Sequence, residues 1–307
     1  MDILVITFGS LGTASTRYRI SQYQEIFLRE GINLFLTEYK NTRKCLNNKA
    51  YLDNLRNTYD LIFIQKAVLW PWELRKLRLT GLPIIYDIDD PIWSSEKNSS
   101  MWVKFKRNFK LNHLLKNVDQ IICSSIPIQD YCLTLNKNVA CIPTVIDTRN
   151  IIKKTHTPKP KIALGWIGHS GNFFNLDSIV DQLNLLDNNC FELIVIADKP
   201  FPSDRLNLKC IFIKWALETE NESILKIDVG LSPFSDNKWN AYKNGFKCIT
   251  YMSRGIPCIT NLKSNIKPDL PNALCFVKNL DWFEVLNDMK SLKTRCQQGE
   301  IGFNFIL

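Results

Sequence analysis

Short apolar runs alternate with longer amphipathic segments along the whole chain. The apolar runs are continuous, as in strands of a parallel sheet that is covered on both faces. The predicted strands of the first half are Ile3–Phe8, Asn33–Thr37, Leu61–Gln65, Pro83–Asp87, Gln120–Cys123 and Val139–Cys141. Those of the second half are Ile162–Ile167, Phe191–Ala197, Cys210–Ile213, Val229–Leu231, Pro257–Thr260 and Leu274–Val277. This alternation predicts β-α-β units and an α/β fold.

The intervening segments have the spacing of amphipathic helices. They include Tyr18–Arg29, Trp70–Leu79, Met101–Leu115, Leu176–Leu186, Glu220–Lys226, Ala241–Ser253 and Asp281–Arg295. The pattern pauses at Thr155–Lys161, where two prolines among polar residues indicate an interdomain linker. We therefore predict two Rossmann-like domains, residues 1–154 and 155–307, which face each other across a cleft. Ligands of such sheets bind beyond the carboxyl ends of the strands.

Composition and charge narrow the class of protein. Of the 307 residues, 45% are hydrophobic and 22% are charged, which is enough apolar material for two cores. No apolar run approaches the ~18 residues of a membrane-spanning helix, and the first residues lack the basic start of a signal peptide. Residues 1–157 hold 22 Lys/Arg and 14 Asp/Glu, whereas residues 158–307 hold 17 and 16. The basic first half suits phosphate, nucleic acid or an anionic membrane face.

The ten cysteines are scattered singly, and none forms a Cys-x-x-Cys pair. With only three histidines, the spacing of a zinc site is absent. We expect buried free thiols in a reducing, cytoplasmic compartment and no metal site.

Two segments of the first half could carry chemistry. Gly9 and Gly12 lie in a Gly/Ser/Thr loop between a predicted strand and a basic helix start, where loop amides attract anions. A plain strand–helix connection explains this loop equally well. Asp87, Asp89 and Asp90 follow an apolar strand. Clustered carboxylates could accept a proton from an acceptor hydroxyl or hydrogen-bond a sugar, although Asp90 could simply cap a turn.

Two segments of the second half could bind phosphate. Gly168 and Gly171 precede a predicted helix, and His169 between them could point into a cleft or be structural. Lys243 and Lys247 are four residues apart, which places both on one face of the predicted helix at Ala241–Ser253. Two such ammonium groups could neutralise a diphosphate, whereas the plainer interpretation is two solvated lysines.

Taken in order, these segments resemble the GT-B glycosyltransferases, specifically the family 4-like "glycosyl transferases group 1". The resemblance extends over roughly residues 2–295, and the spacing from Asp228 to Pro257 is its most specific part. It rests on the segments Tyr86–Trp93, Gly165–Asn172, Lys214–Trp215 with Glu218 and Glu222, Asp228–Asn237, and Gly245–Pro257.

The resemblance implies that the second domain binds a nucleotide diphosphate sugar and that the first binds the acceptor. Gly168, His169, Gly171, Lys243, Lys247 and Thr250 would then line the donor site, and Gly12 and Arg17 the acceptor site. It also implies that no metal or other cofactor is required. Many relatives carry a glutamate where this chain has Thr250, and they continue beyond the position of Ile306–Leu307. A weakened or inactive product is therefore one alternative.

We predict transfer of a sugar to a hydroxyl of a glycan or glycolipid precursor, as in polysaccharide biosynthesis. The alternatives are a non-catalytic nucleotide-sugar-binding protein, an epimerase-like enzyme and a nucleic-acid-binding protein. The last is suggested by charge alone and is not favoured, because no recognised binding motif is present. Trp102, Phe105 and Phe109 would form one stripe of a basic helix, which predicts peripheral contact with an anionic membrane face. Alternatively, these aromatic side chains pack on the sheet.

Overall fold

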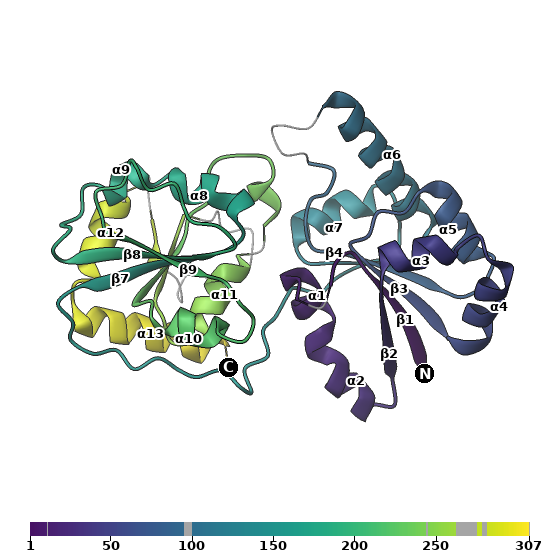
Figure 1. Cartoon of the computed structure of the whole chain (residues 1–307), viewed down its shortest axis with the longest axis horizontal. Helices are drawn as coiled ribbons and strands as arrows, with labels where there is room; N and C mark the ends of the chain where they lie inside the picture. The colour runs from purple at the N-terminus through teal and green to yellow at the C-terminus, as the bar shows by residue number, and fades with distance from the viewer. Residues whose placement is uncertain (11, 95–99, 244, 262–274, 278–280, 307) are drawn as a thin grey trace. The chain divides into compact units, whose positions relative to one another are not determined.

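The computed structural model describes residues 1–10, 12–94, 100–243, 245–261, 275–277 and 281–306 (Figure 1). The chain forms two compact units. Unit 1 comprises Met1–Thr144 together with the short segment Ala241–Asn244, and unit 2 comprises Val145–Asn240 and Gly245–Leu307. The units thus divide before the predicted boundary at residue 154. The segment predicted as a linker lies within unit 2, where His156 Nε2 is 2.9 Å from the carbonyl oxygen of Gly255.

Unit 1 contains a six-stranded sheet in the order β2-β1-β3-β4-β5-β6, in which every pair is parallel. Its strands are β1 (Asp2–Thr7), β2 (Asn33–Glu38), β3 (Leu61–Gln65), β4 (Ile84–Ile88), β5 (Gln120–Cys123) and β6 (Val139–Cys141). The strand order reverses between β1 and β3, and sheets of this kind bind ligands beyond the carboxyl ends of the strands at such a switch point.

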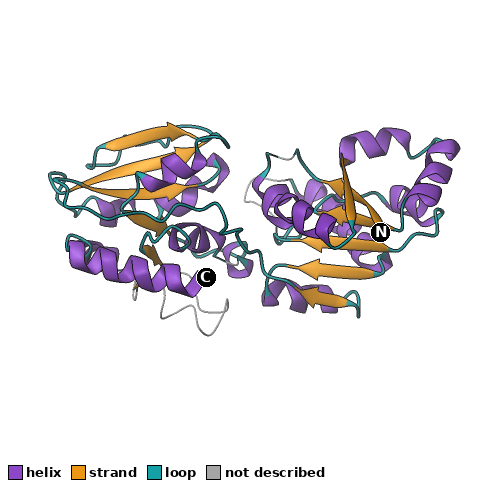
Figure 2. Cartoon of the chain, turned by 90° about the horizontal axis from the view of Figure 1, so that it is seen from below, coloured by secondary structure: helices purple, strands orange, loops and turns teal. Residues whose placement is uncertain are grey.

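Helices cover both faces of this sheet (Figure 2). They are α1 (Ala14–Arg19), the 3-10 turn Ser21–Tyr23, α2 (Gln24–Arg29), α3 (Tyr39–Cys45), α4 (Lys49–Thr58), α5 (Pro71–Arg78), α6 (Met101–Asn117) and α7 (Ile126–Leu133). Successive strand residues point to opposite faces, so that Leu4 and Ile6 belong to the larger core with α4–α7. Ile3 and Val5 belong to the smaller core, with Ile20. The continuous apolar runs therefore reflect burial on both sides.

Unit 2 contains a second parallel sheet, in the order β12-β11-β10-β7-β8-β9. Its strands are β7 (Ile162–Ile167), β8 (Phe191–Ala197), β9 (Cys210–Lys214), β10 (Val229–Ser232), β11 (Cys258–Thr260) and β12 (Cys275–Phe276). Counted from its own first strand, this is the Rossmann order 3-2-1-4-5-6, with the switch point between β7 and β10.

Figure 1 shows α8, α9 and α12 on one face of this sheet, and α10, α11 and α13 on the other. The helical segments are Ser170–Asn172 (3-10), α8 (Phe173–Asp177), α9 (Val180–Leu183), α10 (Glu220–Leu225), Asn240–Tyr242 (3-10), α11 (Phe246–Met252), α12 (Trp282–Asp288) and α13 (Leu292–Ile306). Helix α11 lies very close to the sheet, because Gly230 of β10 has no side chain where the Tyr251 ring packs. A Cβ at Gly230 would lie 2.3 Å from that ring.

The predicted fold class, α/β with two parallel-sheet domains, is confirmed, and each predicted strand is present. Only part of the last one can be compared, since Leu274 lies outside the described residues. Four predicted helices are too long, because the structure divides each of them: Tyr18–Arg29, Leu176–Leu186, Ala241–Ser253 and Asp281–Arg295. In the last, the chain turns after α12 and Ser291 Oγ accepts a hydrogen bond from the amide of Thr294 at the start of α13.

The nine cysteines among the described side chains are free thiols. No helix in the described ranges combines the length and the apolar composition that crossing a bilayer requires. The same residues include no group of three or more His, Cys, Asp or Glu side chains that could hold a metal ion.

Candidate functional sites at the two switch points

The three predicted carboxylates lie at the carboxyl edge of the unit 1 sheet, but they have different partners. Asp87 lies within β4, and its side chain is only 2% exposed. Arg19 Nε donates to both carboxylate oxygens at 3.1 and 3.2 Å, and Nη2 donates to Oδ1. Burial raises the pKa of Asp87, and the guanidinium opposes that rise. Asp87 is therefore committed to a buried ion pair between β4 and α1.

Asp89 and Asp90 follow β4 and contact Lys66, which the sequence analysis did not single out. Lys66 Nζ is 2.9 Å from Asp89 Oδ1 and also pairs with Asp90. Lys66 has φ +60, a backbone conformation that is uncommon outside glycine, and its amide donates to the carbonyl of Asp87 at 2.8 Å. The only sequence signal for this residue is its position directly after the last residue of a strand.

The loop that follows β1 joins the same cluster through its serine. Ser15 Oγ donates to Asp89 Oδ2 at 2.5 Å and accepts from Gln65 Nε2 at 2.6 Å. Gly12 has only Ser10 Oγ within 4 Å of a Cβ position, and the Arg17 guanidinium lies 4.6 Å from the ring centroid of Tyr18. The structure thus brings the β1 loop to Asp89 through Ser15.

Lys243 belongs to unit 1 and pairs with Asp90. Nearby, Ser125 Oγ donates to the carbonyl of Tyr242 at 3.0 Å, and the Tyr242 ring packs edge-on against Trp93. Burial acts to raise the pKa of Asp90, but the ammonium groups of Lys243 and Lys66 hold that pKa well below its usual range. The carboxylate therefore stays ionised between two cations.

The predicted continuous helix at Ala241–Ser253 is wrong. A 3-10 turn ends at Tyr242, and α11 begins only at Phe246, because Gly245 adopts a left-handed conformation with φ +68. Lys243 and Lys247 consequently do not share a helical face. Lys243 contacts Asp90 in unit 1, whereas Lys247 lies on α11 in unit 2.

Lys247 instead lies at the switch point of unit 2. Its Nζ is 3.7 Å from the ring centroid of Trp166, a buried side chain of β7. A Cβ at Gly168, just after β7, would lie 2.8 Å from the Trp166 ring and 3.0 Å from Lys247 Nζ. The absence of a side chain at Gly168 therefore leaves the space in which the lysine crosses the indole, a cation–π arrangement that the sequence did not reveal.

The loop after β7 is stabilised by its own polar groups. Asp198 Oδ1 accepts from the amide of Ser170 at 2.6 Å, and Oδ2 accepts from its hydroxyl at 2.8 Å. His169 Nδ1 accepts from the amide of Gly171 at 3.0 Å, and Nε2 lies 3.6 Å from Asp198 Oδ2. His169 is exposed and fixes the loop in which Gly168 and Gly171 lie.

Thr250 is buried on α11, and its hydroxyl donates to the carbonyl of Phe246 at 3.1 Å.

The loop after β10 is held by Asn175 of α8. Asn175 Oδ1 accepts from the amide of Ser235 at 3.0 Å and from Asn240 Nδ2 at 2.7 Å. Asn175 was not predicted, and an asparagine in an amphipathic helix gives no sequence signal for this role. Helix α8 is thereby connected to the loop after β10.

These features belong to a two-domain fold with parallel α/β sheets, the fold of GT-B glycosyltransferases. An α-glucosyltransferase in complex with UDP and a 13-mer DNA containing an HMU base has a TM-score of 0.69 and 12% identity, over 99% of this chain and 94% of that chain. Lipopolysaccharide outer core galactosyltransferase WaaB has a TM-score of 0.59 and 14% identity, over 99% of this chain and 97% of that chain. HepE from Anabaena, in complex with UDP-glucose, has a TM-score of 0.60 and 11% identity, over 99% of this chain and 93% of that chain.

No protein-family model and no curated protein sequence matches this chain. At identities of 11 to 14% the structural similarity establishes the fold. The predicted exclusion of nucleic acid does not follow from that fold, because the α-glucosyltransferase is itself in complex with DNA.

Proposed function

We propose that this chain is a glycosyltransferase that moves a sugar from a nucleotide diphosphate sugar to a hydroxyl group. The observation that carries the proposal is Lys247, which lies across Trp166 beside Gly168 at the switch point of unit 2. An ammonium group at this position suits a donor diphosphate, because ligands of Rossmann-like sheets bind beyond the carboxyl ends of the strands. Solved structures with the same fold contain UDP or UDP-glucose.

On the donor side we assign Gly168, Gly171 and Lys247 to the diphosphate. His169 acts by holding the loop through Gly171, and Thr250 contributes to the packing of α11. Lys243 is not assigned to the donor site, because its ammonium group pairs with Asp90 in unit 1. In this proposal cationic side chains neutralise the diphosphate without a metal ion.

On the acceptor side we assign Asp89 to the acceptor hydroxyl. Asp87 is buried in its pair with Arg19, and Asp90 is neutralised by two lysines, so neither is suited to accept a proton. Asp89 has Ser15 and a single lysine, Lys66, as partners, so its charge is less fully neutralised than that of Asp90. Asp89→Asn should therefore lower sugar transfer while leaving nucleotide binding nearly unchanged. Transfer at the wild-type rate would contradict the assignment.

The function is tested by thermal stabilisation against a panel of nucleotides and nucleotide sugars, followed by donor turnover. A ligand at 100 times its Kd stabilises a protein by ~2.7 kcal/mol, which is readily measured. Release of free nucleotide from a stabilising nucleotide sugar, increased by an acceptor, supports transfer. A panel in which no nucleotide sugar stabilises the protein refutes the proposal.

A non-catalytic nucleotide-sugar-binding protein is the second candidate. It is favoured by Thr250, which stands where many glycosyltransferases have a glutamate and which uses its hydroxyl within α11. This candidate predicts stabilisation by a nucleotide sugar with no release of nucleotide at any acceptor concentration.

We further propose that unit 1 binds the surface of an anionic membrane through α6, where it would meet a lipid-linked acceptor. Trp102, Phe105 and Phe109 are 71%, 64% and 54% exposed, so these aromatic side chains do not pack on the sheet. Lys104 and Lys106 lie on the same helix, and Lys106 Nζ is 5.9 Å from the ring centroid of Trp102. Basic helices with exposed aromatic side chains bind at the lipid interface.

Sedimentation with vesicles of mixed phosphatidylserine and phosphatidylcholine tests this contact. The test variant replaces four cations of α6 by glutamine, namely Lys104, Lys106, Arg107 and Lys110. The control replaces four exposed cations elsewhere in unit 1, namely Lys49, Arg56, Arg75 and Lys137. Each basic residue near such a surface contributes ~1 kcal/mol, so the α6 variant should lose most binding and the control little. Equal losses in both variants would mean a general charge effect.

A further inference from the structure

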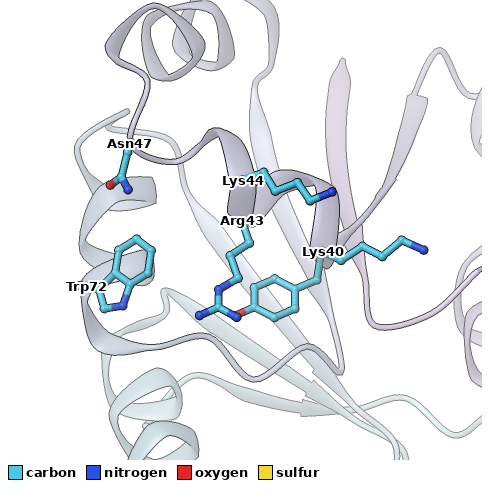
Figure 3. Close-up of a pocket in the computed structure, with 6 residues that line it drawn as sticks. Lys40, Arg43, Lys44, Asn47 and Trp72 are labelled. Atoms are coloured by element: carbon cyan, nitrogen blue, oxygen red, sulfur yellow. The ribbon is translucent and has the colours of Figure 1, made fainter.

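Unit 1 contains an open pocket of about 570 Å³ that none of the proposed roles uses. It is lined by Tyr39, Lys40, Arg43, Lys44, Asn47 and Trp72. Figure 3 shows Lys40 and Lys44 extending in one direction from α3, with Trp72 and Asn47 on the other side and Arg43 between them. Three of the six lining residues are cations, which makes the pocket a concentrated basic site.

The arrangement of the pocket is fixed by a buried acid. The Glu73 side chain is fully buried, and its Oε1 lies 2.7 Å from Arg43 Nε. Its Oε2 accepts from the Tyr39 hydroxyl at 2.5 Å and from the amide of Trp70 at 2.6 Å. These bonds join α3 to the start of α5 and hold Arg43 beside Trp72. The pocket is therefore pre-organised, which lowers the entropy cost of binding a ligand.

Much of the positive charge remains available to a ligand. Within the described part of the chain, Lys44 has no hydrogen bond or ion pair, and Arg43 has only the contact of its Nε with Glu73. Lys40 pairs with Glu38 at 2.7 Å, but this pair is exposed, and such pairs contribute little to stability. The terminal guanidinium nitrogens of Arg43 and the two ammonium groups can therefore turn toward an anion.

The pocket lies on the same edge of the sheet as the carboxylate cluster. Helix α3 begins where β2 ends, and α5 begins a few residues after β3 ends. The connection from β3 to α5 starts with Lys66, which contacts Asp89 and Asp90, and it leads to Trp72 in the pocket. Helix α6 is also close, because Lys110 Nζ lies 4.2 Å from the ring centroid of Trp70.

We propose that this pocket binds a phosphate or diphosphate group of the acceptor, while Trp72 contacts the moiety attached to it. The binding site stands on its own geometry, whereas its assignment to the acceptor rests on the proposed glycosyltransferase function. A guanidinium and two ammonium groups match the geometry and charge of a phosphate, and a 42% exposed indole offers an apolar or stacking surface next to it. The phosphate belongs either to a soluble phosphorylated acceptor or to a lipid.

The test is calorimetric titration of inorganic pyrophosphate with UDP present in excess, so that the proposed donor site is occupied. Arg43→Gln/Lys44→Gln should weaken pyrophosphate binding by at least about tenfold, since two charge-assisted contacts are lost. Arg56→Gln/Lys137→Gln is the matched control, because both residues are exposed and lie near the amino ends of strands, at the opposite edge of the sheet. Removing Arg43 also removes its contact with Glu73 and could destabilise unit 1. Lys44→Glu is therefore tested alone, because it changes the charge of the pocket and keeps that contact.

Unchanged pyrophosphate affinity in Arg43→Gln/Lys44→Gln and Lys44→Glu, or equal weakening in the control, would overturn the proposal. Sedimentation with phosphatidic acid vesicles distinguishes the two sources of phosphate. A parallel loss of vesicle binding in the pocket variants assigns the phosphate to a lipid, and an effect on pyrophosphate alone assigns it to a soluble acceptor. Donor turnover is measured separately. If the wild-type protein turns over donor but the pocket variants bind pyrophosphate normally, only the phosphate-binding role of the pocket is rejected. If the pocket binds pyrophosphate but no donor is turned over, only the enzymatic function is rejected.

Discussion

Asp87→Asn separates a structural carboxylate from a catalytic one. The asparagine has nearly the same shape, but it removes the negative charge that faces Arg19 in an interior where the two side chains are 2% and 5% exposed. Arg19 keeps its hydrogen bond from Nη1 to the carbonyl of Ile142 at 2.6 Å. The remaining amide oxygen accepts only part of what the carboxylate accepted. The variant therefore leaves a buried cation without its counterion.

The expected cost follows from that geometry. Removing one partner of a buried ion pair destabilises a protein by about 3–5 kcal/mol. Because the asparagine amide keeps part of the contact with Arg19, we expect a loss near the lower end, about 3 kcal/mol. For a unit of this size each kcal/mol lowers the Tm by about 2–4 °C, so a fall of about 6–12 °C is expected. Urea unfolding followed by tryptophan fluorescence measures the free energy of unfolding directly.

Two further variants make the interpretation unambiguous. Arg19→Met/Asp87→Leu removes both charges and should be less destabilised than Asp87→Asn, because apolar residues of similar volume can replace a buried pair. Asp89→Asn should lose about 1 kcal/mol, since its carboxylate is more exposed and Lys66 retains Asp90. An Asp87→Asn protein that unfolds at the wild-type urea concentration yet transfers no sugar would refute this reasoning and make Asp87 catalytic.

Three other predictions follow from single contacts. Lys247→Ala should weaken nucleotide binding by about 1.5–3 kcal/mol, whereas Lys243→Ala, at a residue that pairs with Asp90 in unit 1, should change it little; calorimetry that finds the affinity of Lys247→Ala unchanged contradicts the donor assignment. Gly230→Ala should destabilise unit 2 by about 1–3 kcal/mol or more, because its Cβ would lie 2.3 Å from Tyr251; an unchanged urea midpoint would disprove this. The pKa of Asp90 is depressed, so this group stabilises the fold above its unfolded pKa of about 3.9, and the contribution is lost as the pH falls through the folded value. Asp90→Asn should therefore flatten the acid side of the stability profile, and an identical profile would exclude this effect.

The elements of this fold could be predicted because their signal is local. A continuous apolar run such as Ile162–Ile167 is buried on both faces whichever strands flank it. The edge of the sheet that carries Asp89 was also predictable, since polar residues directly after a buried strand lie at its carboxyl end. The break at Gly245 was missed because apolar spacing continues through it, and only the left-handed backbone ends the helical path.

The partners of the carboxylates could not be predicted, because they come from distant parts of the chain. Arg19 and Asp87 are 68 residues apart, and Lys243 and Asp90 are 153 apart. A lysine in the first turn of a predicted helix has the same local pattern whether it faces a diphosphate or an aspartate. The pairing is decided by strand order and by the path of the segment 241–244, which no sequence period encodes.

The arrangement of charge in unit 1 assigns different tasks to identical residues. Asp87, Asp89 and Asp90 lie within four consecutive positions, yet they have different partners. Asp87 is buried in its pair with Arg19, Asp90 lies between two lysines, and Asp89 contacts one lysine and Ser15. Lys66 links the last two, because its left-handed backbone directs the chain from the end of β3 along the end of β4. The same connection then starts α5, whose Glu73 holds Arg43 in the basic pocket. A phosphate in that pocket would therefore bind beside the connection that also holds Asp89. Binding of the acceptor phosphate and positioning of the carboxylate proposed to accept the hydroxyl proton would then depend on the same connection.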